Sequence, residues 1–270
     1  MYNLLKLLKN LYIKLSKKIG FMLIFRDERK SLHNYELKKY KTLTGIYYLP
    51  KYAYQDVIRN EIIKNRIFDK KIFELGKKFI EPGTSIIDAG ANYGQMSILF
   101  SKVCENCSVH SFEASEYIFN ILEKNIKLNS TNITPINCAL SDISGEEYLI
   151  DPDLTNTGTY GALKIQIDSQ NKDLKKNKTQ IKKIDDFSFD KKISLMKIDV
   201  QGWDLKVLRG SIKTIKKNRM PIIFEYEEIF EKEMNYNFED FLILFKNLDY
   251  KFKTVINNNF LVLPKEHKEN

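Results

Sequence analysis

The sequence predicts an α/β sandwich built on a mainly parallel sheet, and three observations support this. From residue 84 onward, short apolar runs alternate with helix-like segments of about ten to fifteen residues, which is typical of parallel strands joined by helical crossovers. The last two apolar runs are separated only by an asparagine turn at 257–259, which indicates an antiparallel edge hairpin. Hydrophobic residues make up 43% of the 270 residues, which suffices for the core of one such domain.

The first eighteen residues predict an amphipathic helix. Leu4, Leu8 and Leu15 share one face, while Lys9 and Lys17 lie on the opposite one. This pattern fits a helix on an anionic membrane surface, which would hold a cytoplasmic protein at the inner face of the membrane. It also fits a helix docked on its own domain or on a second subunit, so peripheral membrane contact and a homo-oligomer are both left open.

Residues 31–79 are expected to continue as helix, interrupted by an extended stretch that contains Tyr47, Tyr48, Tyr52 and Tyr54. Pro82-Gly83 then breaks the chain. We therefore divide the sequence into a helical N-terminal extension or lid at 1–75 and a main domain at 76–270.

The main domain is expected to alternate strands and helices in chain order. The expected strands cover 85–90, 108–115, 133–140, 194–200, 221–228, 250–255 and 260–264. The expected helices cover 95–104, 116–129, 204–217 and 238–248. A turn at Gly145 leads into a hairpin-like segment, and residues 151–183 are polar, which predicts an insertion or a flexible surface loop.

Composition restricts the partners. The formal charge is +9, but only six of the 44 basic residues are arginines and the lysines are spread along the chain. A phosphate-binding surface would gather its basic residues on one face, so we expect no nucleic-acid partner. No apolar run is long enough to cross a membrane, because the longest candidate at 19–25 falls far short of about 20 residues.

The three cysteines fit a reducing compartment without a disulfide framework. Cys104 and Cys107 form a C-x-x-C pair, but a structural zinc site needs four ligands and no second pair exists. We therefore expect no metal at these cysteines, and we expect Cys104, Cys107 and Cys138 to pack as small apolar side chains.

The loop that follows the first strand of the main domain has the composition of a ligand-binding turn. Its sequence, DAGANYG, runs from Asp88 to Gly94 at the carboxyl end of that strand, where open parallel sheets bind ligands. A dinucleotide fingerprint needs glycine at 90, 92 and 95, whereas positions 92 and 95 hold Asn92 and Gln95. Asparagine tolerates a left-handed backbone and adds an amide, but its side chain would crowd a pyrophosphate.

Two acids flank this loop. Asp88 suits an ammonium group better than a phosphate, and Glu113 ends the next strand, where an acid would accept both hydroxyls of a ribose. A ligand with an amino-acid end and a nucleoside end fits this pair. A strand-end residue that caps a helix is the alternative for Asp88.

The segments IIDAGANYG, SFEAS, NCALSDISGE, MKIDVQGWDLKVLRG and PIIFEYE, taken in this order, resemble the FkbM family of S-adenosylmethionine-dependent methyltransferases over about residues 56–230. The resemblance implies a class I methyltransferase fold, Rossmann-like, with a seven-stranded, mostly parallel sheet that contains one antiparallel strand. It also implies O-methylation, commonly of hydroxyls on sugars, surface glycans or polyketide-type metabolites.

Residue by residue, the resemblance implies that the methionine end of the cofactor lies against Asp88, Gly90, Asn92 and Gly94, and the ribose at Glu113. The adenine would lie past the third strand, near Leu140, Ser141 and Asp142. Many methyltransferases have an acid directly at that strand end, where this chain has Ala139 and Leu140.

The second signature, MKIDVQGWDLKVLRG, predicts the catalytic centre. Asp199 ends the fourth strand and could align an acceptor hydroxyl and take its proton, or bind a metal that lowers the pKa of the hydroxyl. Lys197 lies two residues earlier, so it should point to the same side and keep Asp199 ionised, or form a structural ion pair. Glu225 ends the fifth strand and could meet Asp199, with strand-end capping as the alternative.

Two further residues are candidates for contact with the acceptor. Trp203 could stack on a sugar or pack in the core, and Asp204 stands where the family often has glutamate. Gln201 also replaces a frequent glutamate, which removes one metal ligand or base, so a divalent metal is left unassigned.

Three other functions are weighed against glycan O-methylation. A chain that binds the cofactor but lacks catalysis would keep the same loops, and another small metabolite could be the acceptor. A nucleic-acid methyltransferase that modifies base amino groups would carry an N/D-P-P-Y/F signature, which this sequence lacks.

Overall fold

The computed structural model describes residues 36–129, 131–150 and 176–267. In these residues the main sheet has seven strands in the order β11-β12-β10-β9-β3-β4-β5. Their bounds are β3 Ser85–Ala89, β4 Ser108–Glu113, β5 Ile133–Asn137, β9 Ile193–Ile198, β10 Ile222–Glu225, β11 Tyr250–Ile256 and β12 Asn259–Pro264.

The pairing of these strands confirms the predicted fold. β3 is parallel to both β4 and β9, β4 is parallel to β5, and β9 is parallel to β10. β12 runs antiparallel to both of its neighbours, β10 and β11, so the C-terminal hairpin forms the edge of the sheet as expected. The chain moves outward from β3 in two directions, which gives the seven-stranded class I methyltransferase arrangement with one antiparallel strand.

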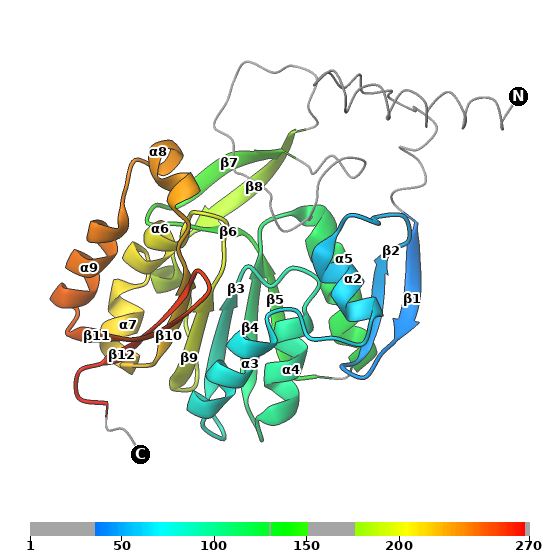
Figure 1. Ribbon diagram of the computed structural model, residues 1–270, viewed down its shortest axis with the longest axis horizontal. Coiled ribbons are helices and arrows are strands. Elements are labelled where there is room, and N and C mark those ends of the chain that lie inside the picture. Colours follow the sequence, from blue (N-terminus) through cyan, green and yellow to red (C-terminus); the bar gives the residue numbers. More distant parts are fainter. Residues whose placement is uncertain (1–35, 130, 151–175, 268–270) are drawn as a thin grey trace, which may run out of the picture.

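Helices cover both faces of this sheet (Figure 1). One hydrophobic cluster joins Ile86 of β3 to the helices that follow β3 and β4, and the other joins Ile87 to the helices that follow β9 and β10. Adjacent strand residues thus serve opposite layers, as strand geometry requires. The helices are α2 Val57–Ile63, α3 Lys70–Gly76, α4 Gln95–Val103, α5 Glu116–Asn129, α6 Asp204–Arg209, α7 Ile212–Asn218, α8 Glu231–Met234 and α9 Phe238–Asn247, with 3-10 turns η2 Lys77–Phe79, η3 Ile184–Asp186 and η4 Glu228–Phe230.

The prediction of helix over 31–79 is wrong at β1 Leu37–Lys41, whereas the expected extended stretch is confirmed at Tyr47 and Tyr48 in β2 Ile46–Pro50, which pairs with β1 as an antiparallel hairpin. Asparagines on α5 explain where the hairpin docks, because the Asn125 side chain bonds both the N–H and the C=O of Tyr48, and Asn129 does the same for Ile46. These amides act like a neighbouring strand for the edge of β2. The predicted helix at 1–18 lies outside the described residues.

A second small sheet replaces part of the predicted insertion. β8 Lys176–Lys182 lies between β6 Ala139–Leu140 and β7 Gly145–Ile150, so the end of the segment at 151–183 is the central strand of this sheet and not a surface loop. Thr179 and Ile181 are buried while their neighbours are exposed, and this alternation inside a lysine-rich segment is the strand signal.

Two predicted elements are interrupted. The strand at 133–140 divides into β5 and β6, which belong to different sheets. The helix at 204–217 divides at Gly210, where a Cβ atom would lie 1.9 Å from the backbone oxygen of Ser141. Only glycine permits this close approach of two backbones.

The expectation of free cysteines is wrong for one pair. Cys104 and Cys107 are joined as a disulfide in the turn between α4 and β4, and Cys138 is a buried free cysteine. The turn brings the two Cα atoms to 5.5 Å, which is within the range that a disulfide bridges.

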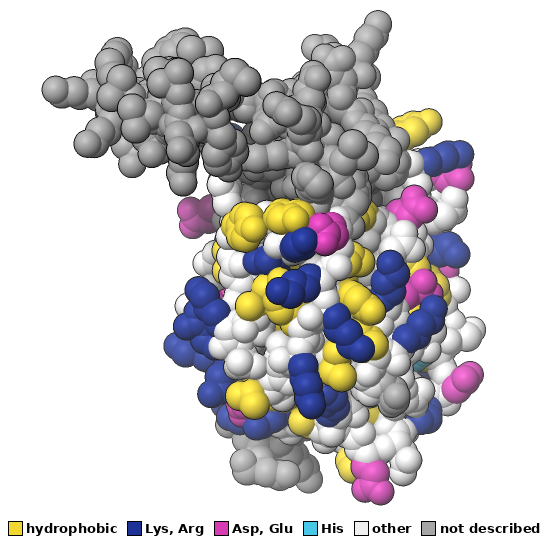
Figure 2. Space-filling model, turned by 90° about the vertical axis from the view of Figure 1, so that its right-hand side faces the viewer, with side chains coloured by type: hydrophobic (Ala, Val, Ile, Leu, Met, Phe, Trp, Pro, Cys, Tyr) yellow, Lys and Arg dark blue, Asp and Glu magenta, His cyan; other side chains and the backbone are white. Residues whose placement is uncertain are grey.

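Basic side chains are scattered among neutral and apolar ones on the face shown in Figure 2. They form no single stripe there, in line with the even spread of lysine along the sequence. Among the described residues, no helix combines the length and the apolar character that crossing a bilayer requires.

Candidate active site

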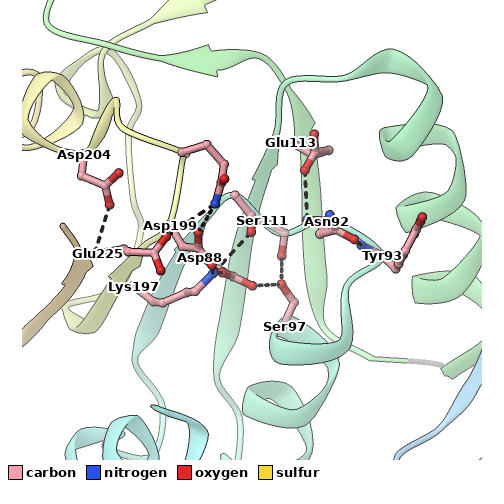
Figure 3. A network of polar contacts seen from close by, with 12 residues as sticks. Asp88, Asn92, Tyr93, Ser97, Ser111, Glu113, Lys197, Asp199, Asp204 and Glu225 are labelled. Atoms are coloured by element: carbon pink, nitrogen blue, oxygen red, sulfur yellow. Dashed lines mark hydrogen bonds and ion pairs between the residues drawn. The ribbon is translucent and has the colours of Figure 1, made fainter. Parts of the chain in front are cut away.

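The carboxyl ends of β3, β4, β9 and β10 meet at one edge of the sheet and bring the predicted residues together (Figure 3). The N–H groups of Gly90 and Ala91 both donate to the Phe112 carbonyl at the end of β4. On the other side of β3, the N–H of Asp199 donates to the Ala89 carbonyl at 3.0 Å. The three loops are thus fastened to one another through their backbones.

The glycine and asparagine of the loop after β3 take the conformation that the sequence predicts. Gly90, Asn92 and Gly94 have φ angles of 81°, 50° and 88°, and Asn92 Oδ1 accepts a hydrogen bond from Tyr93 N at 2.7 Å. A Cβ atom on Gly90 would lie 1.9 Å from the backbone oxygen of Asp199. Gly90 is therefore required for contact between the β3 and β9 loops.

Glu113 lies where a ribose-binding acid is expected. Its two carboxylate oxygens accept the N–H groups of Asn92 and Ser115, each at 2.9 Å, and the side chain remains partly exposed. Burial raises the pKa of Glu113 to about 7, although these backbone hydrogen bonds lower it. Each oxygen keeps a second lone pair for a hydroxyl donor.

Lys197 is the buried cation at the centre of the site. Its Nζ lies 3.3 Å from Asp199 Oδ2, 3.5 Å from Asp88 Oδ1 and 3.4 Å from the Gly90 carbonyl. This confirms that Lys197 and Asp199 point to the same side. Burial lowers the pKa of Lys197, but the nearby carboxylates, Asp199 first, outweigh burial and raise it.

The structure assigns Asp88 a different partner from the one predicted. The residue is fully buried, its Oδ2 accepts from Ser97 at 2.5 Å, and Ser97 in turn accepts from Ser111. Burial raises the pKa of Asp88, and Lys197 and Ser97 lower it. An ammonium group of a ligand does not reach a fully buried carboxylate, so the expected direct contact is not supported and Asp88 instead holds Lys197 in place.

Asp199 and Glu225 meet across the strand ends, as predicted. The Gln201 amide bridges them, with Nε2 at 3.3 Å from Asp199 Oδ1 and 3.5 Å from Glu225 Oε2. Burial raises the pKa of Glu225, and the charges of Asp199 and Asp204 and a side-chain hydrogen bond with Asp199 raise it further. Asp199 itself keeps about a quarter of its side chain exposed, at 23%.

The two residues expected to touch the acceptor are both buried. Trp203 is 4% exposed and the Lys206 ammonium lies 3.8 Å from its ring centre, so the packing alternative is correct. Asp204 is 1% exposed and accepts the N–H of Glu225 at 3.1 Å, while burial and then Asp199 raise its pKa to about 7. The predicted contacts of Trp203 and Asp204 with an acceptor are therefore wrong, because both side chains are enclosed by the fold.

Of the two polar residues expected near the adenine, one is buried and the other is partly exposed. Ser141 is 1% exposed beside Gly210, and its hydroxyl donates to Asp142 Oδ1 at 3.1 Å. Asp142 is partly exposed, so it is the one of the two that a ligand could reach.

Two residues of the site were not predicted. Gln95, noted only as a departure from the dinucleotide fingerprint, is buried and its amide holds the backbone of Arg66 and Phe68. The second residue is Asp69, which comes directly after Phe68 in the chain and interacts electrostatically with Lys197 and Asp199. The described residues contain no group of three or more His, Cys, Asp or Glu side chains suited to a metal ion.

The sequence matches the model of the methyltransferase FkbM domain over residues 88–252, which is more than half of the chain. The chain belongs to the FkbM methyltransferase family. The match begins at the acid that precedes the glycine loop and ends within β11, so it spans every strand end described above.

Relatives of this FkbM-family chain are distant. Methyltransferase 1 of the fungus Beauveria bassiana is 23% identical over 167 residues, which cover 56% of this chain and 66% of that protein. The crystal structure of methyltransferase FkbM from Methylobacillus flagellatus KT shares 14% identity at a TM-score of 0.43, over 71% of this chain and 50% of that one. TYW2 of M. jannaschii, solved in complex with AdoMet, shares 14% identity at a TM-score of 0.37, over 90% and 87% of the two chains. The chain spans 66% of the fungal relative and half of the bacterial one.

Proposed function

We propose that this chain binds S-adenosylmethionine beside Glu113 and transfers its methyl group to a hydroxyl of a sugar, surface glycan or glycan precursor. The observation that carries the proposal is Asp199, a partly exposed carboxylate next to the glycine loop, held by Lys197 on one side and Gln201 on the other. Membership of the FkbM family supports the reaction class.

The hydrogen-bond acceptor beside the loop suits the ribose of the cofactor. Glu113 offers lone pairs for two ribose hydroxyls and is fixed by the N–H groups of Asn92 and Ser115. When bound, the cofactor supplies an electrophilic methyl group on a sulfonium, which leaves as a neutral thioether. The protein then has to align the acceptor oxygen and to receive its proton.

Asp199 is the residue suited to both tasks. The Lys197 ammonium, whose pKa is raised by the carboxylates around it, lies 3.3 Å from the Asp199 carboxylate and supplies the charge that compensates it. Lys197 fixes Asp199 Oδ2 and Gln201 fixes Asp199 Oδ1, and the carboxylate, 23% exposed, keeps further lone pairs for the acceptor hydroxyl. The acceptor proton passes to Asp199 as the new O–CH₃ bond forms.

The test uses the full chain and cofactor labelled in the methyl group. We expect label to appear on a member of a panel of neutral glycosides, and mass spectrometry of the product to show an O-methyl ether. If the chain binds S-adenosylhomocysteine but labels no glycoside, the glycan proposal fails, and small-metabolite or nucleic-acid acceptors are then tried. If no acceptor is labelled, the chain is a cofactor-binding module without catalysis.

A further inference from the structure

Two aspartates, Asp56 and Asp69, precede helices in the N-terminal part of the fold, and they differ in conformation and hydrogen bonding. Asp56 caps α2 in the usual manner, with an extended backbone and Oδ1 accepting Arg59 N at 2.8 Å. Asp69 precedes α3 but has a left-handed φ of 51° and makes no side-chain capping hydrogen bond. An N-cap aspartate normally gains stability from that bond, and a left-handed non-glycine residue costs energy. The Asp69 carboxylate therefore serves something other than the helix.

The course of α3 brings Asp69 to the catalytic end of the sheet. At its C-terminal end, a Cβ atom on Gly76 would lie 3.1 Å from the Leu195 side chain in β9, and α3 lies beside α4 (Figure 1). Seven helical residues span about 10 Å, and the four residues from Leu195 to Asp199 span about 13 Å. Asp69, at the opposite end of α3 from Gly76, thus lies level with Lys197 and Asp199.

Gln95 fixes this segment against the glycine loop. Its Oε1 accepts Phe68 N at 2.9 Å, and its Nε2 donates to the Arg66 carbonyl at 2.9 Å. Gln95 is 5% exposed and is the first residue of α4, directly after Gly94. The residues that precede Asp69 are therefore fastened to the start of α4, directly after the glycine loop.

The charges agree with this placement. Burial raises the pKa of Asp69, the negative charge of Asp199 raises it further, and the ammonium of Lys197 lowers it. Asp69 in turn is one of the carboxylates that raise the pKa of Lys197. These two groups of the β9 end are the charged side chains that act on Asp69.

We propose that Asp69 is an acceptor-binding residue, contributed by the N-terminal segment, that accepts a hydrogen bond from a hydroxyl next to the one that Asp199 aligns. This inference rests on the proposed function. Two carboxylates that both interact with one lysine suit two neighbouring hydroxyls of an uncharged polyol. They repel phosphate, so the site selects neutral glycosides over phosphorylated ones.

The test compares three variants, at Asp69 and at Glu74 of α3, with the unaltered chain. Asp69→Asn should raise KM for the methylated neutral glycoside by about tenfold, with kcat and the Kd for S-adenosylhomocysteine changed by less than about twofold. Asp69→Glu should recover part of this loss, and Glu74→Gln, which removes a surface carboxylate paired with Lys77, should leave KM unchanged. Asp69→Asn should also narrow the preference for the neutral glycoside over its phosphorylated counterpart. An unchanged KM, or an equal loss of cofactor affinity, would overturn the proposal.

A second measurement needs no acceptor. A carboxyl group whose pKa is raised on folding makes folding less favourable as pH rises from its unfolded pKa through the raised value. Asp69→Asn removes this penalty, so its melting temperature should exceed that of the unaltered chain by about 2 °C or more near pH 7.5 and show no gain near pH 4. If no glycoside is methylated, the proposed function fails, whereas equal melting temperatures near pH 7.5 would contradict the raised pKa that burial and Asp199 give Asp69, and with it the placement of Asp69 at the site.

Discussion

The ammonium of Lys197 lies between two carboxylates, 3.5 Å from Asp88 below the glycine loop and 3.3 Å from Asp199 at the entrance of the site. Asp88 is fully buried, whereas the Asp199 side chain is 23% exposed. One lysine therefore compensates a buried structural acid and contacts the acid that we propose as the catalytic one. If Asp199 has that role, stability and catalysis depend on the same side chain.

Lys197→Met is expected to destabilise the protein by about 3–5 kcal/mol near pH 8, because it leaves Asp88 as a buried carboxylate without a cation. Urea unfolding measures this loss. Burial already raises the pKa of Asp88, so a protonated Asp88 needs no cation and the deficit should shrink as the pH falls toward about 4.

The matched control is Lys192→Met, because Lys192 forms an ion pair with Glu81 on the surface, where the Lys192 side chain is 60% exposed. This variant should lose less than about 1 kcal/mol at any pH. Equal losses for the two variants would show that Lys197 is not the cation that compensates Asp88.

Glu113 is expected to link cofactor affinity to pH. Its pKa is raised to about 7 by burial, and hydroxyl donors bind the carboxylate form. The affinity for S-adenosylhomocysteine, measured by calorimetry, should therefore rise as the pH increases through about 7 and level off above it. Glu113→Gln should bind about tenfold more weakly above pH 8 and lose this rise. A variant whose profile runs parallel to that of the unaltered chain would exclude Glu113 as the titrating group.

Gly90→Ala is expected to abolish folding or to destabilise the protein by more than about 4 kcal/mol, because its Cβ would lie 1.9 Å from the Asp199 carbonyl. Gly83 is the control, with a φ of 73° and no atom within 4 Å of the added Cβ. Gly83→Ala should cost only about 1–2 kcal/mol of backbone strain. Thermal unfolding measures the stability of both variants. Similar losses of stability would mean that the loops after β3 and β9 are not in contact at Gly90.

Asn125→Leu should loosen the hairpin from α5. It removes the fully buried amide that bonds both backbone groups of Tyr48 and donates to the Tyr93 carbonyl. Hydrogen exchange should increase at the amide N–H groups of β1 and β2 while those of β3 and β9 keep their protection. Uniform loss of protection across the sheet would instead indicate that the hairpin and the main sheet unfold together.

Strand ends and loop conformations were predictable because each depends on nearby sequence. The apolar runs before Asp88, Glu113 and Asp199 placed these acids at one edge of the sheet, and the left-handed Asn92 followed from its position between two glycines. Once a strand is identified, alternation is local, so the pairing of Lys197 with Asp199 followed as well.

The remaining features depend on contacts between distant parts of the chain. The fold, not a local pattern, buries Trp203 and Asp204 and encloses Asp88 beneath the loop. The place of Asp69 depends on Gln95, whose contact with Phe68 spans 27 residues. The outer edge of β2 is hydrogen-bonded by the side chains of Asn125 and Asn129 on α5, and no periodicity in the sequence predicts such contacts.

Asp199→Asn offers the most direct measurement. The substitution keeps the size of the side chain and removes the charge that would receive the acceptor proton. The Kd for S-adenosylhomocysteine should stay within about twofold of that of the unaltered chain. The rate of methyl transfer from the labelled cofactor to the glycoside should fall by at least about a hundredfold. Undiminished transfer by Asp199→Asn, with the cofactor bound normally, would contradict the assignment of Asp199 as the group that aligns and deprotonates the acceptor.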